Sequence, residues 1–194
     1  MVRWMRAHAA DLHVDPDCIV AMGSSAGAHL AMLAGYASDV ALLEGNGGHA
    51  GVSSRPDLVI DMYGPTDATT PGLRDKALAV RFMGKRYDED PDWYRLASPL
   101  HHLDATDPPT LVIHGDIDQL CPIAQSDALV ERLREVGVPH YYARMRGWPH
   151  LLDLAPQCNG YVHELIDAFL AEHAEADTIA AARQAATPAK PDAA

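Results

Sequence analysis

Short apolar runs alternate with longer amphipathic stretches along most of this 194-residue chain. Runs rich in β-branched, aliphatic and aromatic residues predict buried β-strands at residues 18–22, 57–62, 110–114 and 140–145. Apolar residues at helical spacing predict longer helices at residues 26–37, 123–136 and 159–172. This alternation is typical of an α/β fold, in which a parallel sheet carries helices on both of its faces.

The two ends of the chain differ from this regular pattern. Val2, Met5, Ala9 and Leu12 form one apolar stripe, which predicts a helix just before the first strand. From about residue 174 the chain is rich in Ala, Thr, Lys and Pro, and no large apolar residue follows Ile179. We therefore expect one domain over residues 1–173 and a disordered tail over residues 174–194.

A long excursion separates the second predicted strand from the third. It runs from about residue 66 to residue 108 and contains a helical segment near residues 73–83. It also carries the aromatic pair Trp93-Tyr94, for which packing is the favoured interpretation over an aromatic binding pocket. We expect this excursion to form a cap-like part of the domain.

The most specific motif, Gly-Ser-Ser-Ala-Gly at residues 23–27, lies between the first predicted strand and the following helix. Gly-x-Ser-x-Gly in this context is typical of a nucleophile elbow, a sharp turn that exposes the serine hydroxyl. We expect both Gly23 and Gly27 to be required, because a Cβ at either position would clash with neighbouring backbone. The turn would also direct the Ala26 N–H toward an oxyanion. The alternative is that Ser25 is an ordinary helix N-cap.

An acidic residue and a histidine follow the later predicted strands, in the chain order that such a serine requires. The strand at residues 110–114 is followed by Asp116 and Asp118, and the strand at residues 140–145 is followed by His150. An acid and a histidine therefore appear at strand ends, in the order that the serine requires. Asp116 remains an alternative to Asp118 as the acid.

The chain resembles the α/β-hydrolases, and within them the esterase/lipase group that includes hormone-sensitive-lipase-like and feruloyl-esterase-like carboxylesterases. The resemblance implies Ser25 as nucleophile, Asp118 as acid and His150 as base, with the Ala26 N–H as an oxyanion donor and no metal or organic cofactor. It extends from about residue 1 to about residue 170. The matching stretches are residues 14–17, 23–31, 51–55, 63–67, 97–100 and 114–118, with Pro122, residues 124–126 and His150.

The chain departs from that family pattern upstream of the serine. Family members carry a His-Gly-Gly loop there, which supplies further oxyanion donors, whereas the only local equivalent here is the downstream Gly47-Gly48-His49. The chain thus resembles the C-terminal two-thirds of a hydrolase, with an unpaired edge on the nucleophile strand. Such an edge favours a homo-oligomer or a partner chain that covers it, and the missing donors favour weak activity.

The evidence for a catalytic or metal-binding role is weaker for the other histidines. His29 lies one helical turn after Ser25, and family members often carry His there, so we interpret it as structural. His101 and His102 with Asp104 could suggest a metal site, but adjacent residues rarely converge on one ion. A solvated loop is the favoured interpretation of that cluster.

Composition limits the classes of binding partner and the cellular location that we expect. The formal net charge of −12 argues against binding to nucleic acid or to an anionic membrane. No apolar run approaches the length of a membrane span, and the N-terminus lacks the apolar core of a signal peptide. The three cysteines show neither a disulfide framework nor metal-ligand spacing. A cytoplasmic location is the default expectation.

Three functions remain open. The first is a serine carboxylesterase acting on small carboxylic esters. The second is a catalytically incomplete hydrolase fragment that serves as a binding or assembly module. The third is a serine peptidase of the prolyl-oligopeptidase type, which shares the order of the three residues but usually has an aromatic residue at the position of Ala26.

Overall fold

A four-stranded parallel sheet forms the centre of the computed structural model, which describes residues 1–174. Its strands follow one another in chain order, and each pairs in parallel with the next. The predicted tail beyond residue 174 lies outside the described residues. The strands are β1 (Val20–Ser24), β2 (Leu58–Met62), β3 (Thr110–Gly115) and β4 (His140–Met145).

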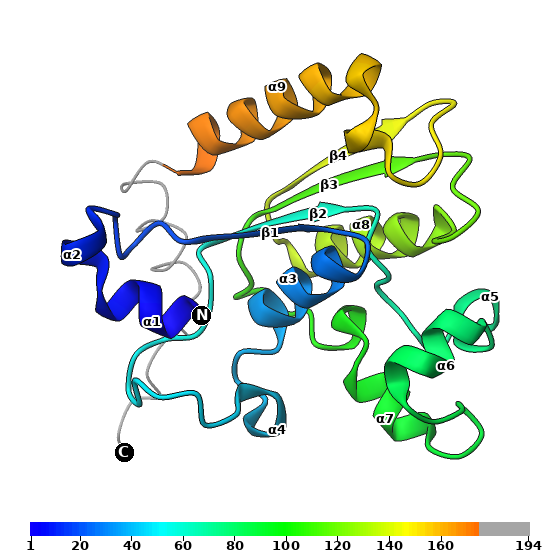
Figure 1. Cartoon of the computed structure of the whole chain (residues 1–194), viewed down its shortest axis with the longest axis horizontal. Helices are drawn as coiled ribbons and strands as arrows, with labels where there is room; N and C mark the ends of the chain where they lie inside the picture. Colours follow the sequence, from blue (N-terminus) through cyan, green and yellow to red (C-terminus); the bar gives the residue numbers. More distant parts are fainter. Residues whose placement is uncertain (175–194) are drawn as a thin grey trace, which may run out of the picture.

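Helices cover both faces of this sheet, as the alternation of strands and helices predicted (Figure 1). On one face, α9 (Pro156–His173) packs its apolar stripe against residues from β2, β3 and β4. On the other face, α3 (Ala26–Tyr36) and α8 (Ala124–Val136) form a second core with Val59 and Val112. Alternate residues of each strand therefore enter two different cores, which explains why β2 and β3 are buried along their whole length.

Shorter helices make up the remaining segments, and none of the helices in residues 1–174 is long and apolar enough to cross a bilayer. The predicted N-terminal helix is interrupted at His8, and the segment predicted near residues 73–83 is divided where Lys76 adopts an extended conformation. These elements are α1 (Val2–Ala7), α2 (Ala9–Leu12), α4 (Ala41–Glu44), α5 (Pro71–Arg74), α6 (Ala77–Met83), α7 (Pro91–Leu96), η1 (Pro99–His101) and η2 (Leu152–Leu154).

Strand β1 forms one edge of the sheet, because within the described residues it pairs only with β2. Met22, in the middle of β1, is 56% exposed although it lies in an apolar run. An exposed strand edge with apolar side chains favours association with another chain. The homo-oligomer or partner chain expected from the sequence stays a prediction.

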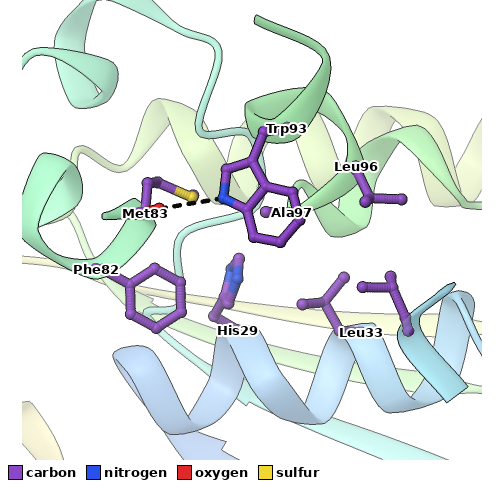
Figure 2. Close-up of a pocket in the computed structure, with 8 residues that line it drawn as sticks. His29, Leu33, Phe82, Met83, Trp93, Leu96 and Ala97 are labelled. Carbon is purple, nitrogen blue, oxygen red and sulfur yellow. Dashed lines mark hydrogen bonds between the residues drawn. The ribbon is translucent and has the colours of Figure 1, made fainter. Parts of the chain in front are cut away.

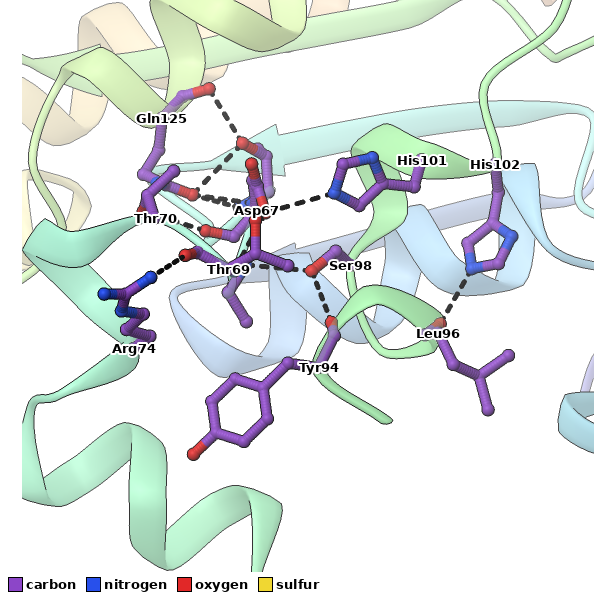
Figure 3. Close-up of polar contacts among 12 residues, drawn as sticks. Asp67, Thr69, Thr70, Arg74, Tyr94, Leu96, Ser98, His101, His102 and Gln125 are labelled. Atoms are coloured by element: carbon purple, nitrogen blue, oxygen red, sulfur yellow. Dashed lines mark hydrogen bonds and ion pairs between the residues drawn. The ribbon is translucent and has the colours of Figure 1, made fainter. Parts of the chain in front are cut away.

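The cap-like excursion is anchored to the sheet and to α8. Helices α6 and α7 lie across from α3, and the side chains between them enclose an apolar pocket (Figure 2). Near the end of β2, the buried Gln125 of α8 accepts the N–H groups of Thr66 and Asp67 at 2.9 and 2.7 Å. Ser98 in turn accepts the N–H of Ala68 at 2.9 Å (Figure 3). These bonds hold the excursion on the side of the sheet covered by α3 and α8.

One buried carboxyl group should make stability depend on pH. Asp61 of β2 is fully buried, its Oδ1 accepts the Gly64 N–H at 2.8 Å, and its Oδ2 has no partner within the described residues. Burial raises the pKa of this carboxyl group from 3.8 to about 7. Between these values the folded protein keeps a proton that the unfolded chain releases, so the free energy of unfolding falls as pH rises.

We expect Asp61→Asn to remove this dependence, because an amide resembles the protonated acid. Between pH 5 and pH 7 the slope of unfolding free energy against pH should become less negative by roughly one kcal/mol per pH unit. Urea unfolding at several pH values measures this slope. The matched control is Asp11→Asn at an exposed position, which should leave it unchanged. Equal slopes in wild type and Asp61→Asn would contradict the prediction.

Candidate active site

Ser25 lies at the sharp turn between β1 and α3. Its backbone has φ 53° and ψ −119°, an unusual combination for a residue other than glycine, and such strain is typical of functional turns. The Ser25 N–H donates to the Met62 carbonyl of β2 at 2.9 Å, which fixes the turn to the neighbouring strand. Ser25 occupies the N-cap position of α3 but its side chain makes no capping bond, so the ordinary N-cap interpretation is wrong.

The two glycines of the motif differ in what they do. A Cβ on Gly23 would lie 2.3 Å from the Gly27 carbonyl carbon, so the first glycine is required for the close approach of strand and helix. A Cβ on Gly27 would meet nothing within 4 Å. The expectation that both positions exclude a side chain is therefore wrong for Gly27, because Gly27 is exposed on the outer side of the turn.

The structure brings Ser25, His150 and Asp118 together in one hydrogen-bonded row. His150 Nε2 lies 3.0 Å from Ser25 Oγ, and His150 Nδ1 lies 2.5 Å from Asp118 Oδ2. Because a carboxylate only accepts hydrogen bonds, Nδ1 carries the proton and Nε2 of the neutral ring is left as an acceptor. The Ser25 hydroxyl therefore donates to His150, and this arrangement can remove the serine proton.

Asp118 accepts four hydrogen bonds inside a fully buried setting. Its Oδ1 accepts the N–H groups of Leu120 and Cys121 at 2.8 and 2.9 Å, and its Oδ2 is shared by His150 and His114. The side chain has no exposed surface. Because a buried carboxylate is costly unless it is paired or bonded, these four donors compensate for the burial of Asp118 beside His150.

His114 of β3 supports this carboxylate as a neutral donor. Its Nε2 faces two acceptors, Asp118 Oδ2 at 3.2 Å and the Cys121 carbonyl at 3.0 Å, so Nε2 must carry the proton. Its Nδ1 accepts from the Ser126 hydroxyl at 2.7 Å. Burial lowers the pKa of His114, which is consistent with a neutral ring held in one tautomer.

The loop that carries His150 is held against the ends of β2 and β3. A Cβ on Gly115 would lie 2.1 Å from the Trp148 carbonyl oxygen, so this glycine is what lets the loop approach β3. The Tyr63 ring packs edge-on against the His150 ring, with centroids 4.6 Å apart. The Tyr63 hydroxyl donates to Asp153, three residues beyond His150, and so ties the loop to β2. Burial and this bond to the carboxylate both raise the pKa of Tyr63.

The other candidates, Asp116 for the acid and His101 with His102 for a metal site, contact groups outside the row of Ser25, His150 and Asp118. Asp116 accepts the Gly147 N–H at 2.6 Å through its Oδ1, as expected of a turn residue. His101 lies 3.3 Å from Asp67, whereas His102 donates to the Leu96 carbonyl at 2.7 Å (Figure 3). The two neighbouring rings therefore face different groups. Within residues 1–174, His, Cys, Asp and Glu side chains form no cluster that could hold a metal ion.

The downstream Gly47-Gly48-His49 does not lie near the serine. The His49 ring packs against the His8 ring at 5.2 Å, between α1 and α2. These helices precede β1, whereas Ser25 follows its other end (Figure 1). Ala26 is the first residue of α3, so its N–H has no acceptor within the helix and is free to serve an oxyanion.

Sequence reasoning missed three supporting residues: His114, Tyr63 and Asp153. His114 could have been suspected, because a polar residue at the end of a continuous apolar strand needs a partner. Tyr63 directly follows β2 and has a positive φ of 48°, a property that no sequence pattern reveals. Asp153 carries no signal in the sequence that we can identify.

The chain is similar to known proteins over most of its length. A family model described as BD-FAE matches residues 1–133. Esterase LipQ of Mycobacterium tuberculosis is 33% identical over 176 residues, and esterase LipC of the same organism is 32% identical over 164 residues. These alignments cover 87% and 79% of this chain but 41% and 39% of the relatives. The chain thus spans about two-fifths of the length of these curated relatives.

Solved structures give the same picture. A truncated carbohydrate esterase from gut microbiota superposes with a TM-score of 0.75 at 31% identity, covering 87% of this chain and 64% of that one. The native thermophilic esterase Est2 of Thermogutta terrifontis superposes with a TM-score of 0.74 at 28% identity. That alignment covers 88% of this chain and 60% of Est2. The fold is therefore shared with esterases that extend beyond the matched region.

Proposed function

Because the chain belongs to the BD-FAE family and has an α/β-hydrolase fold, we propose that it is a serine carboxylesterase for small carboxylic esters. The observation that carries the proposal is the row of hydrogen bonds from Ser25 through His150 to Asp118. The names of the relatives, which are esterases, favour this function over the peptidase alternative.

Catalysis would proceed through an acyl-enzyme. His150 Nε2 takes the Ser25 proton as Oγ attacks the ester carbonyl carbon, and the tetrahedral intermediate carries its negative charge on the former carbonyl oxygen. The Ala26 N–H donates to that oxygen. His150 then gives its proton to the leaving alcohol, and an acyl group remains on Ser25. Water, deprotonated by His150, then attacks the acyl carbonyl carbon. The bond from that carbon to Ser25 Oγ breaks, His150 returns the proton to Oγ, and the carboxylic acid is released.

Asp118 acts on this cycle through His150. Its carboxylate keeps the proton on Nδ1, so that Nε2 is always the nitrogen facing Ser25. It also stabilises the imidazolium that forms when Nε2 takes the serine proton. Its own four hydrogen bonds fix its orientation, and the Tyr63 ring limits how far the imidazole can rotate.

Covalent labelling tests the proposal directly. We expect diisopropyl fluorophosphate to phosphorylate Ser25 with loss of fluoride, because only this serine has His150 within hydrogen-bond distance of its hydroxyl. Hydrolysis of p-nitrophenyl butyrate should be lost in proportion to labelling. Fragment-ion mass spectrometry locates the adduct, and the adjacent Ser24 is an internal control. No adduct, or an adduct on Ser24, would contradict the proposal.

A further inference from the structure

A half-open apolar pocket of about 190 Å³ lies beside α3, outside the row of residues described above. Its walls come from α3, α4, α6 and α7, and Figure 2 shows the His29 ring pointing from α3 into the space between Phe82 and Trp93. All of the other lining side chains are apolar. The lining residues are His29, Leu33, Leu43, Phe82, Met83, Trp93, Leu96 and Ala97.

The protonation state of His29 follows from its surroundings. Its Nδ1 lies 2.9 Å from the Pro65 carbonyl oxygen, which can only accept, so Nδ1 carries a proton. Burial lowers the pKa of the ring, so it is neutral at neutral pH and Nε2 has a lone pair. His29 is 2% exposed, and Nε2 has no hydrogen-bond partner within the described residues. A buried acceptor without a donor is rare and indicates a missing partner.

The polar groups of Trp93 and Lys85, beside the pocket, already have hydrogen-bond or ion-pair partners. The Trp93 indole N–H donates to the Met83 carbonyl at 3.2 Å, as Figure 2 shows. Lys85 lies over the Trp93 ring at 4.9 Å, but its ammonium group is paired with Asp90 at 2.9 Å. The pocket therefore offers a ligand one neutral acceptor, His29 Nε2, within an apolar wall, and no unpaired charge.

We propose that this pocket binds a small neutral apolar molecule whose single hydroxyl group donates to His29 Nε2. An apolar cavity of about 150 Å³ can hold a benzene-sized molecule, so the volume here suits a ring or chain of roughly seven heavy atoms. Phe82 is 54% exposed and its ring lies edge-on to His29, with centroids 5.4 Å apart. Rotation of Phe82 is what exposes Nε2 to the ligand.

The pocket lies beside the proposed catalytic residues but is not formed by them. Ser25, His150 and Asp118 do not line it. His29 and Leu33 follow Ser25 by four and eight residues along α3, which corresponds to a rise of roughly 6 and 12 Å. The proposal therefore goes beyond ester hydrolysis, and it can be tested with molecules that contain no ester.

Cyclohexanol and cyclohexanone form a matched pair of probes. Both have a six-carbon ring and one oxygen atom, but only the alcohol can donate a hydrogen bond. We expect the alcohol to bind up to about tenfold more tightly to the full chain, because the ketone leaves Nε2 without a donor. Titration followed by NMR gives both dissociation constants, and the shifts should centre on His29, Leu33, Phe82 and Trp93. Equal binding of the two probes, or shifts centred elsewhere, would overturn the proposal.

Three variants separate the pocket from other sites. His29→Asn keeps an N–H for the Pro65 carbonyl and removes Nε2, so the preference for the alcohol should disappear. Ala97→Leu adds side-chain volume to the pocket from the α7 side and should weaken binding of both probes at least tenfold. Ser25→Ala should leave both dissociation constants unchanged. An alcohol preference that persists in folded His29→Asn, or that depends on Ser25, would overturn the proposal.

Discussion

Replacement of Ser25 by alanine should reduce kcat/KM for p-nitrophenyl acetate and butyrate by roughly 10⁴ or more. The substitution removes the only atom that can form the acyl-enzyme. It should not disturb the fold, because Ser25 Oγ makes no capping bond and its partner within the site is His150. The backbone of Ser25 is as unusual for alanine as for serine, so the strain of the turn is unchanged.

The matched control for this experiment is the neighbouring serine. Ser24 is the last residue of β1, and Ser24→Ala should retain activity within about tenfold because His150 Nε2 bonds Ser25 Oγ, whereas the Ser24 hydroxyl bonds the Tyr63 hydroxyl. Far-ultraviolet circular dichroism and the urea midpoint establish that both variants are folded. Equal rates for folded wild type and folded Ser25→Ala would exclude Ser25 as nucleophile. The interpretation as a catalytically incomplete hydrolase would then be favoured.

The elbow and the fold could be predicted because both depend on local sequence. Strands β2 and β3 are buried on both faces, and such strands read as continuous apolar runs. Helix α8 ends where Gly137 adopts a positive φ of 80°, a conformation that glycine favours. The position of Ser25 at the turn could be predicted because the strand, the turn and the helix around it are adjacent in the chain.

The supporting contacts could not be predicted because they join distant segments. The bond from Tyr63 to Asp153 spans 90 residues, and neither residue type is unusual at its position. The prediction that residue 27 must be glycine was wrong. Whether a Cβ fits at a position depends on which atoms lie near it in the folded chain, and none lies within 4 Å of a Cβ at Gly27. The family resemblance favours a structural role for His29. The hydrogen bond from His29 Nδ1 to the Pro65 carbonyl is consistent with a structural role. The lack of a partner for Nε2 could not be predicted, because it depends on how α6 and α7 pack against α3.

Asp118→Asn should lower kcat/KM by about 10⁴ through the tautomer of His150. The N–H groups of Leu120 and Cys121 face Oδ1, so an asparagine must keep its carbonyl oxygen there and turn its NH₂ group toward His150. His150 Nδ1 then accepts a hydrogen bond, and the proton moves to Nε2. An Nε2 that carries a proton cannot take one from Ser25.

Asp116→Asn is the control that separates the two acidic residues of this loop. Asp116 uses one oxygen, which accepts the Gly147 N–H, and the carbonyl oxygen of an asparagine can keep that bond. We therefore expect activity within about threefold of wild type. Because Asp118→Asn leaves substrate contacts intact, its loss should appear in kcat with KM nearly unchanged. A similar loss in both variants would mean that the loop geometry matters rather than the carboxylate facing His150. A loss confined to Asp116→Asn would reverse the assignment of the acid.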